Sequence, residues 1–230
     1  MPIFISFPFY SLFSKNAISY KVKKAPIREQ IYHILKGRIM ERTYQAGSKL
    51  SIISISKEFN VSNSPVREAF SMLEKDGLVE IYPNAGPSVI NFSREKVSQI
   101  AQAILSMLLG SLEICRQADR IDQLITLLQN ALNIQTAHMH QCSEQEYARY
   151  SIAFEASFIQ CCQNPYITRQ YTEIEDLFYL TVMYDHWYIN TIRGRNVIEH
   201  QQILGAVKAG DFQRAKDLLI DHYNRFDNVN

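Results

Sequence analysis

Residues 61–80, VSNSPVREAFSMLEKDGLVE, carry the signals of a tight turn, a helix and the beginning of a strand. We expect Ser64 to cap the helix and Pro65 to occupy its first position, where a missing N–H costs no hydrogen bond. Gly77 is expected to end the helix. A capped helix that follows another helix after a tight turn is an arrangement that reads the major groove of DNA. One face of this expected recognition helix is apolar at helical spacing: Val66, Ala69, Phe70 and Leu73.

The residues on either side of this segment predict the rest of a winged helix. Residues 27–39 repeat Ile or Leu at helical spacing, which predicts a first helix. A second, short helix is expected from Ser51, a residue type that favours N-caps, to Asn60. After the recognition helix, LVEIY at 78–82 has the composition of a strand, and residues 88–90 can return as a second strand after the turn PNAG. The two strands would form a β-hairpin wing.

The order of these motifs resembles the winged-helix domain of the GntR family of bacterial transcription regulators. The resemblance covers about residues 26–91 and rests on the stretch 47–50, on VSNSPVREAF at 61–70, on LEKDGLVE at 73–80 and on a wing glycine. It combines several features in the family's order, whereas a bare helix-turn-helix pattern would be a weak signal. The resemblance implies binding to double-stranded operator DNA through four positions: Asn63, Ser64, Arg67 and Gly86.

Two positions depart from the family's usual pattern. The family usually has Arg where this chain has Asn63, and often has a basic residue near Ile53. An Arg that binds guanine through two hydrogen bonds contributes about 1–3 kcal/mol of discrimination, so its loss changes the preferred base or weakens binding. For Arg67, the alternative to a base contact is an ion pair on the helix surface with Glu68 or Glu74.

The distribution of charge along the chain suggests two parts with different partners. The 230 residues include 24 Lys+Arg and 23 Asp+Glu, for a formal net charge of +1. Residues 1–93 contain 12 basic and 7 acidic residues, a balance of +5, whereas residues 94–230 contain 12 basic and 16 acidic residues, a balance of −4. A basic first part and an acidic remainder suggest a nucleic-acid module joined to a second domain.

Composition excludes several other classes of protein. With 47% hydrophobic and 20% charged residues, the chain is neither disordered nor collagen-like. Its four cysteines form no CxxC pair, so we expect reduced thiols in a cytoplasmic protein. Residues 3–13 are apolar, but the run is too short to span a bilayer and no basic residue precedes it, which predicts no signal peptide and no membrane partner. We expect an extra segment or a start codon set too far upstream there, with an anchor or a docking strand as the alternative.

From residue 93 onward the sequence predicts helices alone, because no segment alternates for long with period two. We therefore expect a mainly α fold: an N-terminal extension at 1–25, a winged helix-turn-helix domain at 26–92, and an all-α antiparallel bundle of about six helices at 93–230. Helix starts are expected at Ser93, Asp119, Ser143 with Glu146 as a capping box, Asn164, Arg195 or Asn196, and Asp211.

The first helix of this bundle, residues 97–113, is apolar nearly all round and contains no basic residue. Such a helix must be covered on two sides. A second copy of the chain is the simplest cover and predicts a homodimer. A central position within the monomer is the alternative.

Three polar residues lie where the apolar stripes of the later helices predict apolar ones. His200 and His222 each share a stripe with apolar residues, and Glu155 lies on the stripe of Tyr147 and Phe158. A buried carboxylate needs a partner. Imidazole and carboxylate groups from facing helices can bind a divalent metal ion, and they can equally form a hydrogen-bonded cluster without one.

A second resemblance covers about residues 94–228. AFEASFIQCCQNPYI at 153–167 and IEHQQILGAVKAGDFQRAKDLLIDHYNRF at 198–226 resemble the FCD-type helical effector domain of the FadR branch of the same family. In many members an Asp and three His bind a metal beneath the small-molecule site. The matching positions here are Ser151, Glu155, His200 and His222. Since Ser151 is a poor ligand, the resemblance implies a three-ligand site at Glu155, His200 and His222 for Zn, Ni or Mn, with a metal-free cluster as the alternative.

The resemblance also bears on the effector. Family members commonly sense small carboxylates, often with an Arg in the first bundle helix, yet residues 97–113 contain none. Other arginines are candidates by chemistry only: Arg149, Arg169, Arg193 and Arg195.

These observations predict a ligand-responsive bacterial transcription regulator that binds a palindromic operator as a homodimer and is not an enzyme. The alternative is a metal-dependent small-molecule binding protein or hydrolase that uses the Glu/His cluster. No nucleophile or Gly-rich phosphate loop accompanies that cluster, which favours the regulator.

Overall fold

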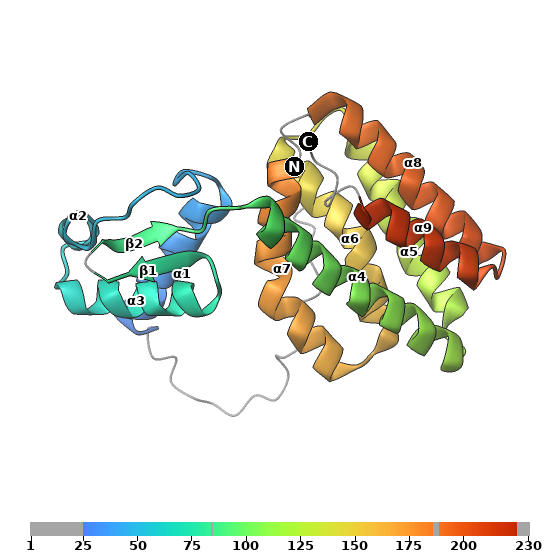
Figure 1. Cartoon of the computed structure of the whole chain (residues 1–230), viewed down its shortest axis with the longest axis horizontal. Helices are drawn as coiled ribbons and strands as arrows, with labels where there is room; N and C mark the ends of the chain where they lie inside the picture. The colour runs from blue at the N-terminus through green and yellow to red at the C-terminus, as the bar shows by residue number, and fades with distance from the viewer. Residues whose placement is uncertain (1–24, 84, 186–188, 225–230) are drawn as a thin grey trace.

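The computed structural model describes residues 25–83, 85–185 and 189–224 (Figure 1). Residues 3–13, for which an extra segment or an anchor is expected, lie outside the described residues. The described part is mainly helical with a small two-stranded wing, as predicted. Its elements follow in the order α1 (Ile27–Met40), α2 (Ile52–Glu58), α3 (Asn63–Lys75), β1 (Val79–Tyr82), β2 (Gly86–Val89), α4 (Arg94–Gln117), α5 (Ile121–His138), α6 (Glu144–Cys162), α7 (Pro165–Asp185), α8 (Ile189–Lys208) and α9 (Phe212–Asn224).

The N-terminal part is a winged helix, built from α1, α2, α3 and the antiparallel pair β1–β2. Ser51 caps α2 as expected, because its side chain accepts a hydrogen bond from the backbone N–H of Ser54 at 3.2 Å. The apolar stripe of α3 packs against α1. All four of its predicted members are buried: Val66, Ala69, Phe70 and Leu73.

Two details predicted around the recognition helix are wrong. The N-cap of α3 is Ser62 and not Ser64, so Asn63 is the first helical residue. Pro65 is still accommodated, because the N–H groups of the first turn have no acceptor within the helix. Gly86 is the first residue of β2 and not part of the turn, and its φ of +79° is a conformation that favours glycine.

Gly77, just after α3, has a φ of +72°, and a Cβ added there would lie 3.1 Å from Leu177 Cδ1. We expect Gly77→Ala to lower the free energy of unfolding by about 1–2 kcal/mol, because alanine resists this conformation and Leu177 would have to move. Gly37→Ala is the control: Gly37 lies inside α1, with no atom within 4 Å of an added Cβ. Alanine there should stabilise by about 0.5–1 kcal/mol. Denaturant unfolding measures both changes. Equal free energies of unfolding for the two variants would contradict the prediction.

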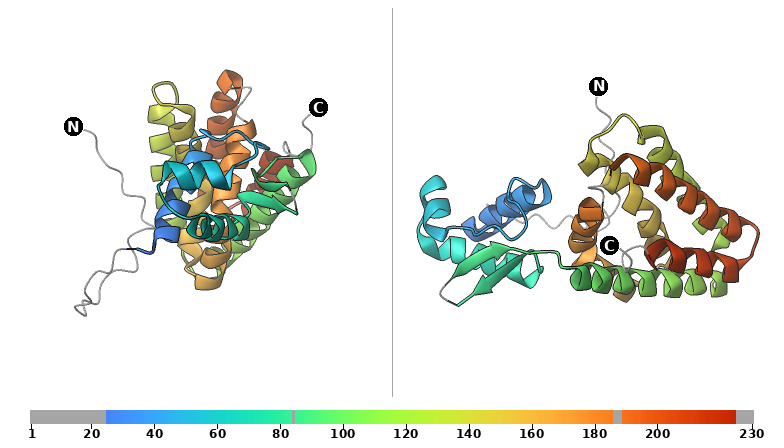
Figure 2. Two further views of the ribbon diagram at one scale, coloured as in Figure 1. Left: turned by 90° about the vertical axis from the view of Figure 1, so that its left-hand side faces the viewer. Right: turned by 45° about the horizontal axis from the view of Figure 1, so that its top comes forward.

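The helical part contains α4 to α9, and α6 packs against α4, α5 and α7. The right view of Figure 2 shows the chain passing from the winged helix into α4, at the lower edge of the helical part. The predicted capping box at α6 is confirmed: Ser143 Oγ accepts from the Glu146 N–H, and the Glu146 carboxylate accepts from the Ser143 N–H. Ser93 caps α4 as expected. Asn164 and Asp211 also precede helices, and their side chains accept backbone N–H groups of the first turn.

Two of the expected helix starts are wrong. The N-cap of α5 is Arg120, one residue after Asp119, whose φ is +55°. α8 begins at Ile189, six residues before the expected Arg195. It continues through Gly194, because packing against α5 and α9 outweighs the low helix propensity of a single glycine.

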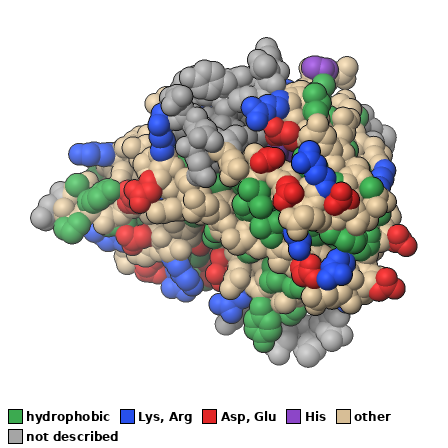
Figure 3. Space-filling view, turned by 45° about the vertical axis from the view of Figure 1, so that its right-hand side comes forward, with side chains coloured by type: hydrophobic (Ala, Val, Ile, Leu, Met, Phe, Trp, Pro, Cys, Tyr) green, Lys and Arg blue, Asp and Glu red, His purple; other side chains and the backbone are tan. Residues whose placement is uncertain are grey.

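α4 is only partly covered by the rest of the chain. Its inner face is fully buried, with Ile104, Leu108 and Leu112 at 0% exposure. Several apolar residues outside that face are only half-buried: Ile100, Leu105, Met107 and Leu109. By length and composition α4 could cross a membrane, a test that the core helix of a soluble protein also passes, and 33% of its apolar window is buried. Figure 3 shows one face of the molecule, on which apolar side chains form separate patches between charged ones.

Candidate functional site

Three helices bring Glu155, His200 and His222 together inside the helical part. Glu155 comes from the central helix α6, His200 from α8 and His222 from α9. All three side chains are buried, with residue exposures of 3%, 0% and 2%. Glu155 Oε1 lies 3.2 Å from His200 Nε2 and 3.5 Å from His222 Nε2. One ligand atom from each residue lies within 4.8 Å of the other two.

The partners of His200 determine which of its ring nitrogens carries a proton. Gln135 Nε2 donates to Tyr147 Oη at 3.1 Å and to Asn196 Oδ1, so the Gln135 amide oxygen faces His200. That oxygen lies 2.9 Å from His200 Nδ1 and can only accept a hydrogen bond. His200 therefore carries a proton on Nδ1. In the neutral ring, the lone pair of Nε2 points at Glu155.

His222 is oriented in the same way by a carboxylate. Its Nδ1 lies 2.7 Å from Glu199 Oε2, an acceptor, so the Nδ1 of His222 is protonated as well. Its Nε2 lone pair then also points at Glu155 Oε1. Two imidazole lone pairs and one carboxylate oxygen repel one another at these distances. A bound proton or a metal cation must lie among them.

The geometry of the cluster fits a divalent metal ion. Ligand atoms about 2.1 Å from a tetrahedral ion are about 3.4 Å apart, which is close to the two distances from Glu155 Oε1. The second carboxylate oxygen, Glu155 Oε2, is buried and has no hydrogen-bond partner among the described residues. Histidines that bind metals almost always donate their other N–H to a carboxylate or carbonyl, as His222 and His200 do here. Nitrogen and oxygen ligands of this kind suit Zn, Ni and Mn.

The Glu155 carboxyl is ionised in this environment. Burial raises its pKa, but in the absence of a metal ion positively charged His200 and His222 rings, which donate Nε2–H groups to the carboxylate, lower it more strongly, and the net pKa falls to about 2. The ring of Phe154 stacks on His200, with centroids 4.1 Å apart and an angle of 8° between the planes. This stacking and the hydrogen bond to Gln135 hold the His200 ring in one orientation.

The hydroxyl of Ser151 is engaged with a neighbouring amide. It donates to Asn196 Oδ1 at 3.0 Å and so belongs to the amide network that supports His200. Sequence reasoning missed the supporting residues. A signal was present in the sequence, because Gln135 continues an apolar stripe of α5 and Asn196 lies four residues before His200 on α8. The missed residues are Gln135, Asn196 and Glu199.

Of the arginines considered for an effector, three are already engaged. Arg169 pairs with Glu173 at 3.1 Å and Arg195 with Glu199 at 2.6 Å. Arg193 donates to the backbone oxygen of Met139 at 3.0 Å. Arg149 instead lies over the ring of Tyr179, 4.9 Å from its centroid.

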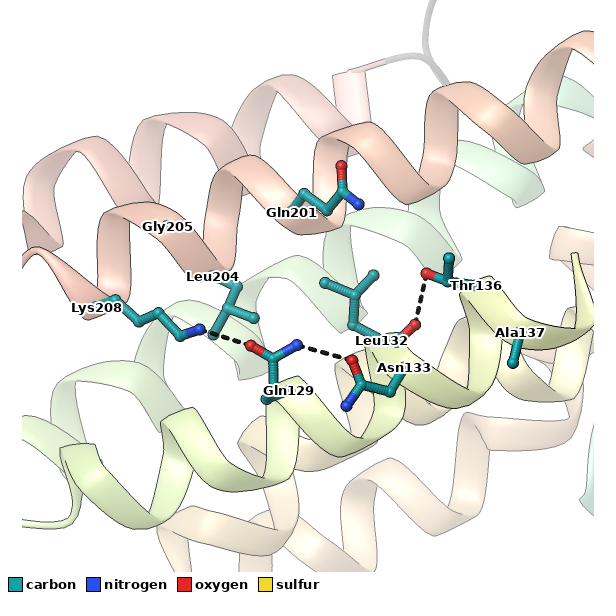
Figure 4. Close-up of a pocket in the computed structure, with 9 residues that line it drawn as sticks. All are labelled: Gln129, Leu132, Asn133, Thr136, Ala137, Gln201, Leu204, Gly205 and Lys208. Atoms are coloured by element: carbon teal, nitrogen blue, oxygen red, sulfur yellow. Dashed lines mark hydrogen bonds between the residues drawn. The ribbon is translucent and has the colours of Figure 1, made fainter.

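A groove of about 490 Å³ lies between α5 and α8 and is open to solvent (Figure 4). Lys208 Nζ donates to Gln129 Oε1 at 2.6 Å, and Gln129 Nε2 donates to Asn133 Oδ1 at 2.9 Å. These polar side chains bond to one another, and none of the three cluster residues lines the groove.

The four positions implied for DNA contact lie on the first turns of α3 and at the wing. Asn63, Ser64 and Arg67 are exposed. Asn63 Oδ1 accepts a hydrogen bond from Ser56 Oγ at 2.7 Å, so this side chain also ties α3 to α2. At Gly86, no atom lies within 4 Å of an added Cβ. The wing backbone is therefore open to an approaching ligand.

Arg67 does not form the ion pair considered as its alternative role. Glu68 pairs with Arg28 at 3.1 Å, and Glu74 accepts the backbone N–H of Ile81 at 3.3 Å. Within residues 25–83, 85–185 and 189–224, no ion pair or hydrogen bond of the Arg67 side chain is present. Its guanidinium is available to an external partner. The family's second basic position is replaced by Ile53, which is 60% exposed on α2.

Comparisons with known proteins agree with this architecture. Residues 20–89 match the family model of bacterial regulatory proteins of the gntR family, and residues 108–225 match the FCD domain. The chain is 26% identical over 205 residues to the HTH-type transcriptional regulator YdhC of Bacillus subtilis, covering 88% of this chain and 90% of YdhC. It is 43% identical over 82 residues to the HTH-type transcriptional repressor RspR of Escherichia coli, covering 34% of this chain and 36% of RspR.

A solved structure shares the fold. The Escherichia coli protein McbR/YncC superposes with a TM-score of 0.63 at 15% identity, covering 88% of this chain and 95% of that chain. The two family models together span the winged helix and most of the helical part. The chain therefore belongs to the GntR family of bacterial transcription regulators, with an N-terminal helix-turn-helix domain followed by an FCD domain.

Proposed function

We propose that this regulator binds a palindromic operator as a homodimer, and that a metal-containing site in its FCD domain binds a small-molecule effector. The proposal places the DNA-binding domain at residues 26–92 and the effector-binding and dimerisation domain at residues 93–230. The linker between β2 and α4 supports this division. The proposed location is the cytoplasm, without a membrane partner, as suits a regulator that binds DNA.

The observation that supports DNA recognition is the guanidinium of Arg67, which has no ion pair or hydrogen bond among the described residues. It projects from the second turn of α3, and residues near the N-terminus of a recognition helix are those that reach base edges. Arg can bind guanine through two hydrogen bonds, and the neighbouring acidic residues do not compete for it. Asn63 would replace the family's usual Arg and favour a different base, since Asn pairs best with adenine. Ser64 and the wing backbone at Gly86 would contact phosphates.

The support for a metal site is the convergence of three acceptor atoms at Glu155, His200 and His222. Their other polar atoms are oriented by Gln135 and Glu199, which leaves the lone pairs directed inward. A divalent ion held there would supply a positive centre for an oxygen atom of an effector. A carboxylate effector agrees with such a centre. The ion would also neutralise the buried charge of Glu155, whose second oxygen has no partner among the described residues.

The support for a homodimer is the half-buried apolar surface of α4. Ile100, Met107 and other apolar residues there are incompletely covered by the chain's own helices. A symmetric contact with a second copy would bury them and present two recognition helices to a palindrome.

Selection from random duplexes tests the proposed DNA binding. At about 0.15 M salt, we expect the protein to bind its selected operator about 10³-fold or more tightly than random duplex. We expect the affinity for both to fall steeply as salt is raised, because phosphate contacts release counterions. Equal affinity for both duplexes across the salt series would contradict specific regulation.

The hydrolase alternative receives no support from the comparisons, because the matching family consists of transcription regulators. A metal-loaded protein is expected to bind small molecules without converting them. Product formation that depends on Glu155 would contradict this assignment.

A further inference from the structure

The ammonium group of Lys36 lies between the two domains. Lys36 belongs to α1 of the DNA-binding domain, and its side chain is only 22% exposed. Its Nζ forms an ion pair with Asp176 of α7 in the helical domain, lies 3.8 Å from Asp76 Oδ2, and donates to Tyr32 Oη at 3.2 Å. Burial lowers the pKa of Lys36, but the ion pair with Asp176 and the hydrogen bond to Tyr32 raise it more strongly, so the net pKa is raised. Lys36 thus remains charged and joins the domains.

Asp76 links this ion pair to the recognition helix. It is the C-cap residue of α3, and Tyr32 Oη donates a hydrogen bond to its carboxylate. Lys36 and Tyr32 therefore hold the C-terminal end of α3, and Asp176 holds Lys36. The proposed base-contacting residues lie toward the opposite end of the same helix, about 14 Å (Arg67) to 20 Å (Asn63) away along its axis. Asp176 can affect the position of α3 without touching DNA.

Two further contacts lie at the same boundary. Leu177 of α7 packs against the backbone at Gly77, one residue after Asp76. Lys96, at the start of α4, pairs with Glu80 of β1 at 2.7 Å. One contact lies at the recognition helix and the other at the wing, so together they restrict rotation of the DNA-binding domain about the linker. Figure 1 shows α7 as the helix of the bundle that faces the DNA-binding domain.

We infer that Asp176, through Lys36, is a specificity-determining residue for the spacing of the two operator half-sites. In a homodimer, the separation of the two recognition helices depends on how each DNA-binding domain is held against its helical domain. The Lys36–Asp176 ion pair holds the DNA-binding domain against the helical domain near the C-terminal end of α3. This inference rests on the proposed homodimer and palindromic operator, and it adds the residue that makes the protein discriminate between spacings.

A dimer discriminates between half-site spacings only when its two DNA-binding domains are held in fixed positions. An insertion of two base pairs moves one half-site along the duplex and rotates it about the axis, so a rigid dimer loses contacts at that half-site. A dimer with loosely held DNA-binding domains can follow the displaced half-site. Because the linker is short and the contacts at the boundary are made by single side chains, removal of one ion pair is expected to loosen the arrangement.

The test compares three duplexes: the operator recovered by selection, the same operator lengthened by two base pairs between its half-sites, and a single half-site. Wild-type protein is expected to bind the native spacing about tenfold or more tightly than the lengthened one. Asp176→Ala is expected to reduce this ratio by about threefold to tenfold. Its affinity for the single half-site should stay unchanged, because the recognition helix keeps its own residues. Asp176→Glu, which retains the charge, should restore the ratio.

Glu173→Ala is the matched control. Glu173 lies on the same helix and pairs with Arg169, but both side chains are well exposed, at 61% and 78%. This variant should keep the spacing ratio of the wild type. Thermal unfolding of each variant confirms that it is folded, and Lys36→Met provides a second way to remove the ion pair.

The outcomes separate the inference from the proposed function. A full spacing ratio in both Asp176→Ala and Lys36→Met would overturn the inference alone. An equal reduction in Glu173→Ala would also overturn it, because the effect would then not depend on the boundary. A wild-type protein that binds a selected operator without any spacing preference would overturn both the inference and the homodimeric mode of binding.

Discussion

Replacing Arg67 by alanine is expected to remove most of the protein's preference for its operator over random duplex. The guanidinium is exposed and unpaired among the described residues, so the loss is a loss of DNA contact and not of a structural ion pair. One bidentate contact to guanine contributes about 1–3 kcal/mol, and a symmetric dimer makes it twice. The affinity for the operator should therefore fall by about 30-fold or more, with a smaller loss for random duplex. Titrations of labelled operator and random duplex at one salt concentration measure both values.

Arg169→Ala is the control for the loss of one positive charge. Arg169 lies on α7 and pairs with Glu173, far along the chain from the recognition helix. Its replacement should leave the operator affinity unchanged. An Arg67→Ala protein that keeps its operator preference would refute the assignment of Arg67 to base recognition. A parallel loss for both duplexes would instead assign Arg67 to phosphate binding.

Replacing His200 by alanine is expected to abolish metal binding by the FCD domain. His200 supplies one of three converging ligand atoms, and two ligands seldom hold a structural or catalytic ion. Metal analysis of protein reloaded with Zn²⁺ should give about one ion per chain for the wild type and close to none for the variant. The substitution also leaves Glu155 buried without its closest partner, which is expected to cost about 3–5 kcal/mol of unfolding free energy.

His138→Ala is the matched control for this experiment. His138, which is only partly buried, also has an Nδ1 hydrogen bond, to the backbone oxygen of Ile134 at 2.9 Å, but it lies outside the cluster. It should retain the metal content of the wild type. Glu155→Gln provides a ligand change of nearly equal volume in case His200→Ala fails to fold. Undiminished metal content in either cluster variant would contradict the three-ligand site, and a wild type that binds no Zn²⁺ would support the metal-free cluster.

The position of the cluster could be predicted because each member departs from an apolar stripe on its own helix. Glu155, His200 and His222 each lie where helical periodicity places a buried side chain, and all three are buried. Of the residues that orient them, Gln135 follows the same rule, because it continues the apolar stripe of α5, but Glu199 does not. Glu199 is half-buried next to His200, and helical periodicity alone does not show that it reaches α9.

Errors in the predicted elements occurred where local preferences were nearly balanced. Ser62 and Ser64 are both suitable N-cap residues, and α3 begins after Ser62 because the first turn accommodates Pro65. The helix start expected at Arg195 or Asn196 lies inside α8, because tertiary packing carries this helix from Ile189 through Gly194. Propensities of less than about 1 kcal/mol per residue are easily outweighed by packing.

The sequence by itself determined the features that depend on residues within about four positions of one another. These include the capping box of Ser143 and Glu146, the end of α3 before Gly77, and the apolar stripes that define each helix. Only the tertiary structure decided which polar side chains meet. His200 and Gln135 are 65 residues apart, His200 and Glu155 are 45 apart, and Lys36 meets Asp176 across the domain boundary. Such pairings depend on how helices pack in space, because one helix's periodicity shows which side is buried but not which partner lies against it.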